Sequence, residues 1–132
     1  MRCAIAAGLA FGLLCLSPTD VAADHANRVL ILELDYLKAQ YDKGRRLTPI
    51  DLRSRDEFSR GHLPGAHSLP LDELTTRFHE IPTADLVVLY CDCTSAEAEG
   101  AYRFLREQRY RNVSILGAGF KAWEEKGYPI EH

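Results

Sequence analysis

Hydrophobic positions in this chain form short runs that alternate between strand-like and helix-like spacing. The apolar runs at residues 47–52, 86–90 and 112–116 have the length of strands, and the run at 86–90 is the most apolar. A strand buried on both faces of a parallel sheet has such an uninterrupted apolar sequence, so this run is expected at the centre of the sheet. Looser spacing predicts helices at residues 29–41, 56–59, 71–78, 95–108 and 120–125. This alternation predicts one α/β domain with a small, mainly parallel sheet flanked by helices on both faces.

The first residues differ in kind from the rest of the chain. Arg2 precedes an apolar run at residues 3–16, and the small-residue sequence VAA follows at 21–23. Because this run is shorter than the about 20 residues that span a bilayer, it is typical of a secretory signal peptide. We therefore expect residues 1–23 to be a signal peptide. Residues 24–132 would be the mature domain, secreted across the inner membrane into the periplasm without stable membrane insertion.

Composition, charge and cysteine count exclude several function classes. A chain with 46% hydrophobic and 27% charged residues has the composition of an ordinary soluble domain. The formal net charge of -3 and the lack of a basic patch argue against a nucleic-acid partner. Signal cleavage would leave Cys91 and Cys93 as the only cysteines, too few for a four-ligand zinc site or a disulfide-stapled scaffold. Neither a metal nor an organic cofactor is expected.

Cys91 is the residue best placed for chemistry. It follows the predicted central strand, and the short polar stretch at residues 92–96 opens the next helix. A turn of this kind directs backbone N–H groups and the positive end of a helix toward the thiol. Such settings lower a cysteine pKa from about 8.5 to roughly 3.5–7.5, which makes the thiolate available as a nucleophile. The alternative is a buried strand-end cysteine that serves only packing.

Four motifs follow one another along the mature chain: PIDLRSRDEF at residues 49–58, GHLPGA at 61–66, LYC at 89–91, and GAGFKAW at 117–123 with GYP at 127–129. In this order they resemble the signatures of the rhodanese-like sulfurtransferase family. Each is weak alone, but together they cover nearly the whole mature chain in the family's order and spacing. The resemblance implies that residues 24–132 form a rhodanese-like domain, a three-layer α/β fold.

The resemblance also implies an enzyme, a thiosulfate-type sulfurtransferase. Cys91 would be the catalytic residue and would carry sulfane sulfur as a persulfide. The donor would be a small sulfur-containing anion such as thiosulfate, and the acceptor cyanide or a thiol, including a protein thiol. Backbone N–H groups of the loop would stabilise the persulfide. By position, the residues expected to bind substrate are Asp92, Cys93, Thr94, Ser95, Ala96 and Arg53.

The loop after Cys91 departs from the family pattern in its charge. Typical members place an arginine where this chain has Ala96 and Glu97, and Glu99 adds further negative charge. A dianion such as thiosulfate is therefore expected to bind weakly, with Arg53 replacing part of the missing positive charge. Acidic residues also suit the first turn of a helix, and Thr94 or Ser95 is expected to cap that helix.

Cys93 opens an alternative mechanism. Its thiol could attack a persulfide or sulfenate on Cys91 and close a disulfide, which would make a redox relay or a self-resolving sulfur carrier. An oxidising compartment favours such a bond, although a disulfide across one intervening residue would be strained and reducible. Cys93 could instead merely fill the loop. The alternative function is thus a non-catalytic binding module or a thiol-disulfide redox module that uses the Cys91/Cys93 pair.

Four other residues with chemical side chains are expected to be structural. Asp51 and Arg53 stand at the end of the first predicted strand, where such a pair ties loops around the site. His62 lies between two glycine-containing turns and is expected to make a scaffold hydrogen bond. Trp123 is expected to pack as a core aromatic against the sheet.

Overall fold

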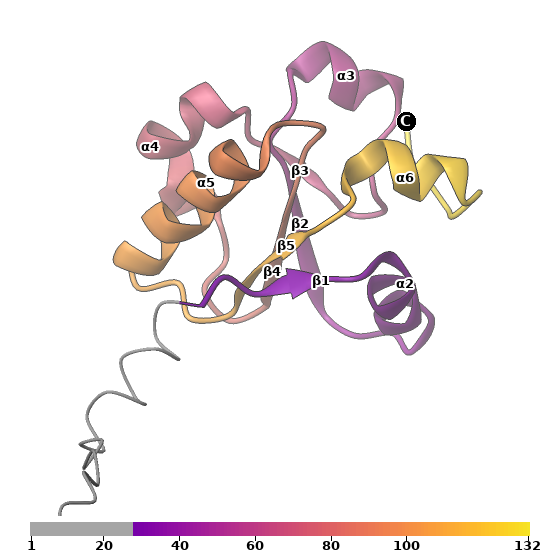
Figure 1. Cartoon of the computed structure of the whole chain (residues 1–132), viewed down its shortest axis with the longest axis horizontal. Helices are drawn as coiled ribbons and strands as arrows, with labels where there is room; N and C mark the ends of the chain where they lie inside the picture. Colours follow the sequence, from indigo (N-terminus) through magenta and orange to yellow (C-terminus); the bar gives the residue numbers. More distant parts are fainter. Residues whose placement is uncertain (1–27) are drawn as a thin grey trace, which may run out of the picture.

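Five short strands form one sheet at the centre of the molecule, and every pairing between them is parallel (Figure 1). The structure is a computed structural model and describes residues 28–132. The predicted signal peptide, residues 1–23, lies outside the described residues. In chain order the strands are β1 (Ile31–Leu32), β2 (Leu47–Asp51), β3 (His67–Ser68), β4 (Leu86–Tyr90) and β5 (Val113–Leu116). Their order across the sheet is β1-β5-β4-β2-β3.

Helices cover both faces of the sheet, so the molecule has three layers (Figure 1). The helices are α2 (Leu34–Asp42), α3 (Arg55–Arg60), α4 (Leu74–Arg77), α5 (Ser95–Glu107) and α6 (Gly119–Glu125), with 3-10 turns η1 (Leu71–Glu73) and η2 (Phe78–Glu80) around α4. Side chains of α4 and α5 share one hydrophobic cluster, and those of α2 and α6 share the other. The predicted α/β fold with a parallel sheet between two helical layers is confirmed.

The sequence of β4 explains its central position. Val87 and Leu89 belong to the cluster beneath α5, whereas Val88 and Tyr90 belong to the cluster beneath α2 and α6. Successive side chains of a strand point to opposite faces, so a strand covered on both sides needs apolar residues at every position. All four side chains are at most 1% exposed, and the prediction that this strand is central is confirmed.

The two edge strands depart from the sequence prediction. The helix predicted at residues 29–41 begins only at Leu34, because Ile31 and Leu32 pair with β5. The consecutive apolar residues before Leu34 fit a helix as well as an edge strand, and in the structure their backbone pairs with β5 instead of forming a helical turn. No strand was predicted at β3, since a two-residue strand that includes a histidine has no strand-like pattern.

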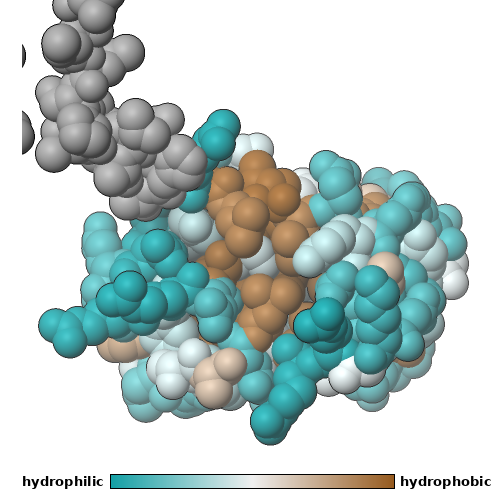
Figure 2. Space-filling model, turned by 90° about the horizontal axis from the view of Figure 1, so that it is seen from below, coloured by the Kyte–Doolittle hydropathy of each residue, from teal (hydrophilic) through white to brown (hydrophobic). Residues whose placement is uncertain are grey.

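The β1 edge leaves apolar side chains at the surface. Leu30 and Ile31 are 52% and 55% exposed, and Figure 2 shows hydrophobic surface gathered in the middle of one face of the molecule. None of the helices in the described part of the chain has the length and apolar character needed to cross a bilayer. The exposed edge matters for function because Ile31 lines the hollow beside Cys91.

Candidate functional site

The candidate site is the short loop of residues 91–94, here called the thiol loop. It leaves the carboxyl end of the central strand β4 and leads directly into α5. In open parallel sheets, ligands bind outside the carboxyl ends of the strands, and the positive end of α5 points at the same place. The fold therefore places Cys91 where the sequence predicted it, at the end of β4 and next to a helix N-terminus.

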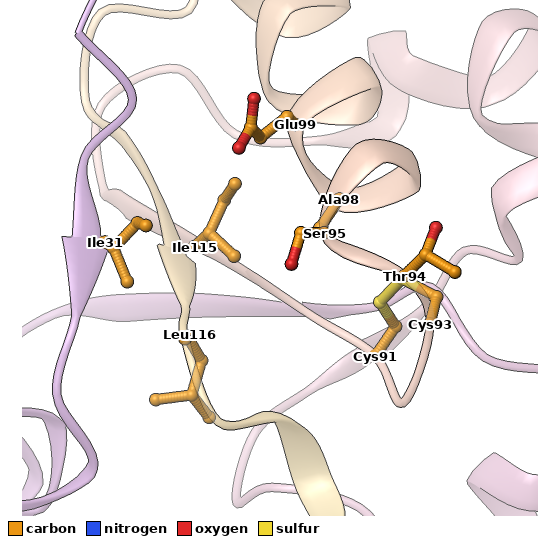
Figure 3. Close-up of a pocket in the computed structure, with 10 residues that line it drawn as sticks. Ile31, Cys91, Cys93, Thr94, Ser95, Ala98, Glu99, Ile115 and Leu116 are labelled. Atoms are coloured by element: carbon orange, nitrogen blue, oxygen red, sulfur yellow. A yellow bond between two sulfur atoms is a disulfide. The ribbon is translucent and has the colours of Figure 1, made fainter.

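The two cysteines of the thiol loop are joined as a disulfide (Figure 3). Their Cα atoms are 5.3 Å apart, with one residue between them in sequence. Cys91 is half-buried and Cys93 is exposed. In this oxidised state neither sulfur is a free nucleophile, so chemistry at Cys91 requires reduction of the pair first.

The disulfide lies between two hollows. One, with a volume of about 100 Å³, reaches toward β1 and β5 (Figure 3). Its lining residues are Ile31, Cys91, Cys93, Thr94, Ser95, Ala98, Glu99, Ile115, Leu116 and Gly117. The other, of about 240 Å³, opens toward α3 and is lined by Leu52, Arg53, Ser54, Glu57, Leu71, Cys91, Asp92, Cys93 and Glu97. A small substrate can approach the cysteine pair from an apolar side and from a charged side.

Helix α6 holds the first half of the thiol loop. The Asp92 carboxylate accepts a hydrogen bond from the backbone N–H of Lys121 at 3.0 Å, in the first turn of α6. Gly119 has a φ of +72°, and a Cβ there would stand 2.3 Å from the Cys91 carbonyl oxygen. Only glycine allows this close approach in this backbone conformation. Asp92 therefore has a structural role in this structure, one that its position in the sequence did not reveal.

A capping box holds the second half of the thiol loop. The Thr94 hydroxyl accepts a hydrogen bond from the Glu97 backbone N–H, and the Glu97 carboxylate accepts one from the Thr94 backbone N–H at 2.9 Å. These bonds from the backbone and side chain of Thr94 lower the pKa of Glu97. The predicted cap is confirmed for Thr94. The Thr94 N–H, however, already donates to the Glu97 carboxylate, so it is not free to stabilise a bound sulfur as the sequence suggested.

Arg53 reaches the site from β2 but is largely neutralised. Its guanidinium donates to Asp51 at 2.6 Å and to the Gly61 carbonyl at 2.7 Å, and it stacks on the Phe120 ring at 3.9 Å. Burial alone would lower the pKa of Arg53, but the hydrogen bonds and charge of Asp51 raise it overall. Another guanidinium nitrogen lies 4.0 Å from Asp92. Arg53 thus contributes a paired, buried cation to the charged hollow.

The same Asp51 carboxylate also anchors the strand that carries Cys91. The Tyr90 hydroxyl donates to Asp51 at 2.9 Å and accepts the Leu63 backbone N–H at 3.2 Å. Burial, and after it the charge of Asp51, raises the pKa of Tyr90 well above its ordinary value. The residue directly before Cys91 is therefore fixed by a buried hydrogen-bond network.

The remaining predicted residues divide between the site and the scaffold. Thr94 and Ser95 line the apolar hollow, whereas Ala96 is exposed on α5 and lines neither hollow. His62 Nδ1 lies 2.9 Å from the Phe58 carbonyl and its ring stacks on the Phe58 ring, which confirms a scaffold role. Trp123 is fully buried, as predicted. No group of three or more metal-ligating side chains occurs within residues 28–132.

Sequence reasoning missed the apolar wall of the site. Ile31, Ile115 and Leu116 line the hollow beside Cys91, and they come from β1 and β5. The convergence of parallel strands at one edge was a usable signal for β5, because its carboxyl end had to lie beside that of β4. For Ile31 no such signal was available, since it was predicted to lie in a helix.

The parallel sheet, with a cysteine in the loop after its central strand, can now be compared with known proteins. The family model for the rhodanese-like domain matches residues 33–126, and the chain belongs to this family. Among solved structures, it is similar to the Alr3790 protein from Anabaena sp., with a TM-score of 0.68 and 26% identity. That similarity covers 76% of this chain and 81% of the other.

Curated relatives include proteins named as sulfurtransferases. The chain is 36% identical over 81 residues to a sulfurtransferase from Allochromatium vinosum, covering 61% of this chain and 75% of that one. It is 32% identical over 91 residues to the thiosulfate sulfurtransferase GlpE from Shewanella oneidensis, covering 65% and 84%. Of two Bacillus subtilis relatives, the chain spans 56% of YrkF and 64% of YqhL. Sulfurtransferases thus recur among its relatives at modest identity.

The close packing at Gly119 predicts opposite effects for two glycine-to-alanine substitutions. Gly119→Ala forces a Cβ against the Cys91 carbonyl and into a left-handed backbone conformation, so the chain should lose roughly 1–3 kcal/mol of unfolding free energy. Gly100→Ala, at an exposed position of α5 with open space around it, should gain about 0.5–1 kcal/mol. Urea unfolding of both variants measures the difference, and an unchanged Gly119→Ala protein would contradict the packing described.

The capping box predicts a pH dependence at the start of α5. Because the pKa of Glu97 is lower in the folded chain than its ordinary value of 4.5, the cap stabilises the fold fully above that value. The contribution is lost as pH falls through the lower, folded pKa. An NMR titration of the Thr94 amide should give a midpoint below 4.5, shifted upward in Thr94→Ala. A midpoint at or above 4.5 in the unmodified chain would show that the box does not form.

Proposed function

We propose that this protein is an exported sulfurtransferase that carries sulfane sulfur as a persulfide on Cys91. The observation that carries the proposal is the place of Cys91, at the carboxyl end of β4, beside the N-terminus of α5 and between two hollows. Membership of the rhodanese-like family and the sulfurtransferases among the relatives support it. The donor is of the thiosulfate type, and the acceptor is a thiophile such as cyanide or a thiol.

The reaction needs two displacements at sulfur. In the first, the Cys91 thiolate attacks the outer sulfur of thiosulfate, the sulfur–sulfur bond of thiosulfate breaks, and sulfite leaves with the bonding electron pair. In the second, the acceptor attacks the outer sulfur of the persulfide, and Cys91 leaves as a thiolate. The two steps together return Cys91 to its thiolate, so transfer to an external acceptor needs the disulfide reduced only before the first turnover.

The charges that line these two hollows disfavour an anionic donor. Glu57, Asp92, Glu97 and Glu99 line the two hollows, and Arg53 is the basic residue among the described linings. Since Arg53 is paired with Asp51, it attracts a dianion less than a free guanidinium would. Thiosulfate is therefore a working donor with weak binding, which appears as a high KM and not as a low kcat.

A thiol-disulfide redox module is the second candidate function. The Cys91–Cys93 disulfide favours it, because two neighbouring thiols that form and break a disulfide donate and accept two electrons without any other group. The two functions differ in whether a sulfur atom is transferred. Sulfur transfer that depends on Cys91 supports the first, and reversible disulfide formation without sulfur uptake supports the second.

Replacement of Cys91 tests the proposal. After reduction with dithiothreitol and desalting, the chain should convert thiosulfate and cyanide into thiocyanate, which is measured colorimetrically as its iron complex. Cys91→Ser should lower the rate by roughly three orders of magnitude or more, because it removes the nucleophile.

The matched variant at the neighbouring cysteine controls for loss of the loop structure. Cys93→Ser should still form thiocyanate, since cyanide supplies the acceptor from solution. Activity that survives either single substitution and disappears only in the double variant would reject Cys91 as the sole nucleophile. Absence of thiocyanate from both the reduced, unmodified chain and the Cys93→Ser variant would reject sulfur transfer to cyanide.

Export to the periplasm is part of the proposal and has its own test. The full chain, expressed in a bacterium with two membranes, should appear in the periplasmic fraction with Asp24 as its first residue, as read by mass spectrometry. Leu13→Arg interrupts the apolar run and should leave the chain unprocessed. An intact N-terminus in the cytoplasmic fraction of the unmodified chain would overturn the signal-peptide assignment.

A further inference from the structure

We propose that Cys93 discharges the Cys91 persulfide inside the thiol loop, releasing hydrosulfide and closing the Cys91–Cys93 disulfide. The acceptor that completes the cycle is then a dithiol, which reduces this disulfide. The inference rests on the proposed function, because it begins from the persulfide on Cys91. It goes further by assigning a chemical role to Cys93 and a substrate class to the second half of the reaction.

The first supporting observation is that the two sulfurs are within bonding reach in the folded chain. They form the disulfide shown in Figure 3, while the backbone around them keeps its strand, cap and helix. Asp92, the residue between them, is held by the Lys121 N–H, and Cys91 packs on Gly119. The product of the proposed step is therefore compatible with the intact fold.

The second observation is the charge of the surroundings. An external acceptor such as cyanide or sulfite is an anion, and it must pass Glu99 in one hollow or the carboxylates of Glu57, Asp92 and Glu97 in the other. Cys93 needs no approach, because it belongs to the loop itself. A reacting group held in place competes at effective concentrations of roughly 10⁵ M or more when its orientation is good.

The proposed step balances in atoms and electrons. The Cys93 thiolate attacks the inner sulfur of the persulfide, which is Sγ of Cys91. A bond between the two cysteine sulfurs forms, the bond from Cys91 Sγ to the outer sulfur breaks, and the outer sulfur leaves as hydrosulfide with the bonding electron pair. The persulfide is thereby reduced to hydrosulfide, and the two cysteines are oxidised to the disulfide.

The exposure of the cysteines indicates why the reductant is a dithiol. Cys93 is exposed and Cys91 is half-buried, so an incoming thiolate reaches Cys93 first and forms a mixed disulfide with it. The freed Cys91 thiolate could then expel a monothiol again and restore the starting state. A dithiol avoids this return, because its second thiol attacks the mixed disulfide and displaces Cys93. The dithiol then leaves as a cyclic disulfide, and both cysteines are reduced.

A single-turnover experiment without external thiol tests the inference. The full chain carries Cys3→Ser and Cys15→Ser in every sample, so that Cys91 and Cys93 are the only cysteines. After anaerobic reduction and desalting, thiosulfate is added, hydrosulfide is trapped with monobromobimane, and the intact mass is measured. Cys93→Ser and Cys91→Ser are made in the same background.

The parent chain should release close to one hydrosulfide per chain and lose the mass of two hydrogen atoms. Cys93→Ser should instead gain the mass of one sulfur atom and release hydrosulfide at least about tenfold more slowly, since it lacks the neighbouring thiol. Cys91→Ser should do neither. Addition of dithiothreitol should restart hydrosulfide release from the parent chain.

Three results would overturn the inference. A parent chain that keeps the added sulfur, with Cys93 still open to alkylation, would exclude the internal discharge while leaving the proposed function standing. A Cys93→Ser chain that takes up no sulfur would overturn the proposed function, and the inference with it. Equal turnover with a monothiol at the same thiol concentration would exclude a dithiol as the acceptor class.

Discussion

The site depends on one buried carboxylate, that of Asp51. It has no exposed surface, and it accepts hydrogen bonds from the Arg53 guanidinium and backbone N–H and from the Tyr90 hydroxyl. A buried charge without such partners would be costly, so the three groups are held in place around it. Tyr90 directly precedes Cys91, and Arg53 continues to the Gly61 carbonyl and the Phe120 ring. Through these contacts, Asp51 joins β2, β4 and α6 at the edge of the sheet where the thiol loop lies.

The network also determines how much positive charge the site retains. Arg53 is the basic side chain in the described lining of the two hollows, and most of its hydrogen-bonding capacity is directed at Asp51 and Gly61. A sulfurtransferase that relied on binding its donor as an anion would need a less committed cation. This chain has the family's scaffold, but the carboxylates in the lining of its two hollows oppose the approach of an anion.

Sequence reasoning recovered the features that depend on local patterns. The uninterrupted apolar run of β4, the cap at Thr94 and the buried Trp123 each follow from the residues themselves. It failed where pairing over long distance decided the outcome, as in β1, whose residues also fit a helix, and in β3, which is only two residues long. The structural role of Asp92 was hidden for the same reason, because its partner Lys121 lies 29 residues away along the chain.

The spacing of the two cysteines gives the loop a property that a single thiol lacks. With one residue between them, Cys91 and Cys93 remain neighbours in the chain, and in this structure their sulfurs are bonded across the loop. Gly119 and the capping box hold the two ends of this loop on different helices, α6 and α5. In this loop geometry, a persulfide on Cys91 has the Cys93 thiol beside it, unless Cys93 is blocked. Whether sulfur leaves this protein as a transferred atom or as hydrosulfide is then decided by competition between Cys93 and the external acceptor, and the carboxylates around the loop favour Cys93 whenever that acceptor is an anion.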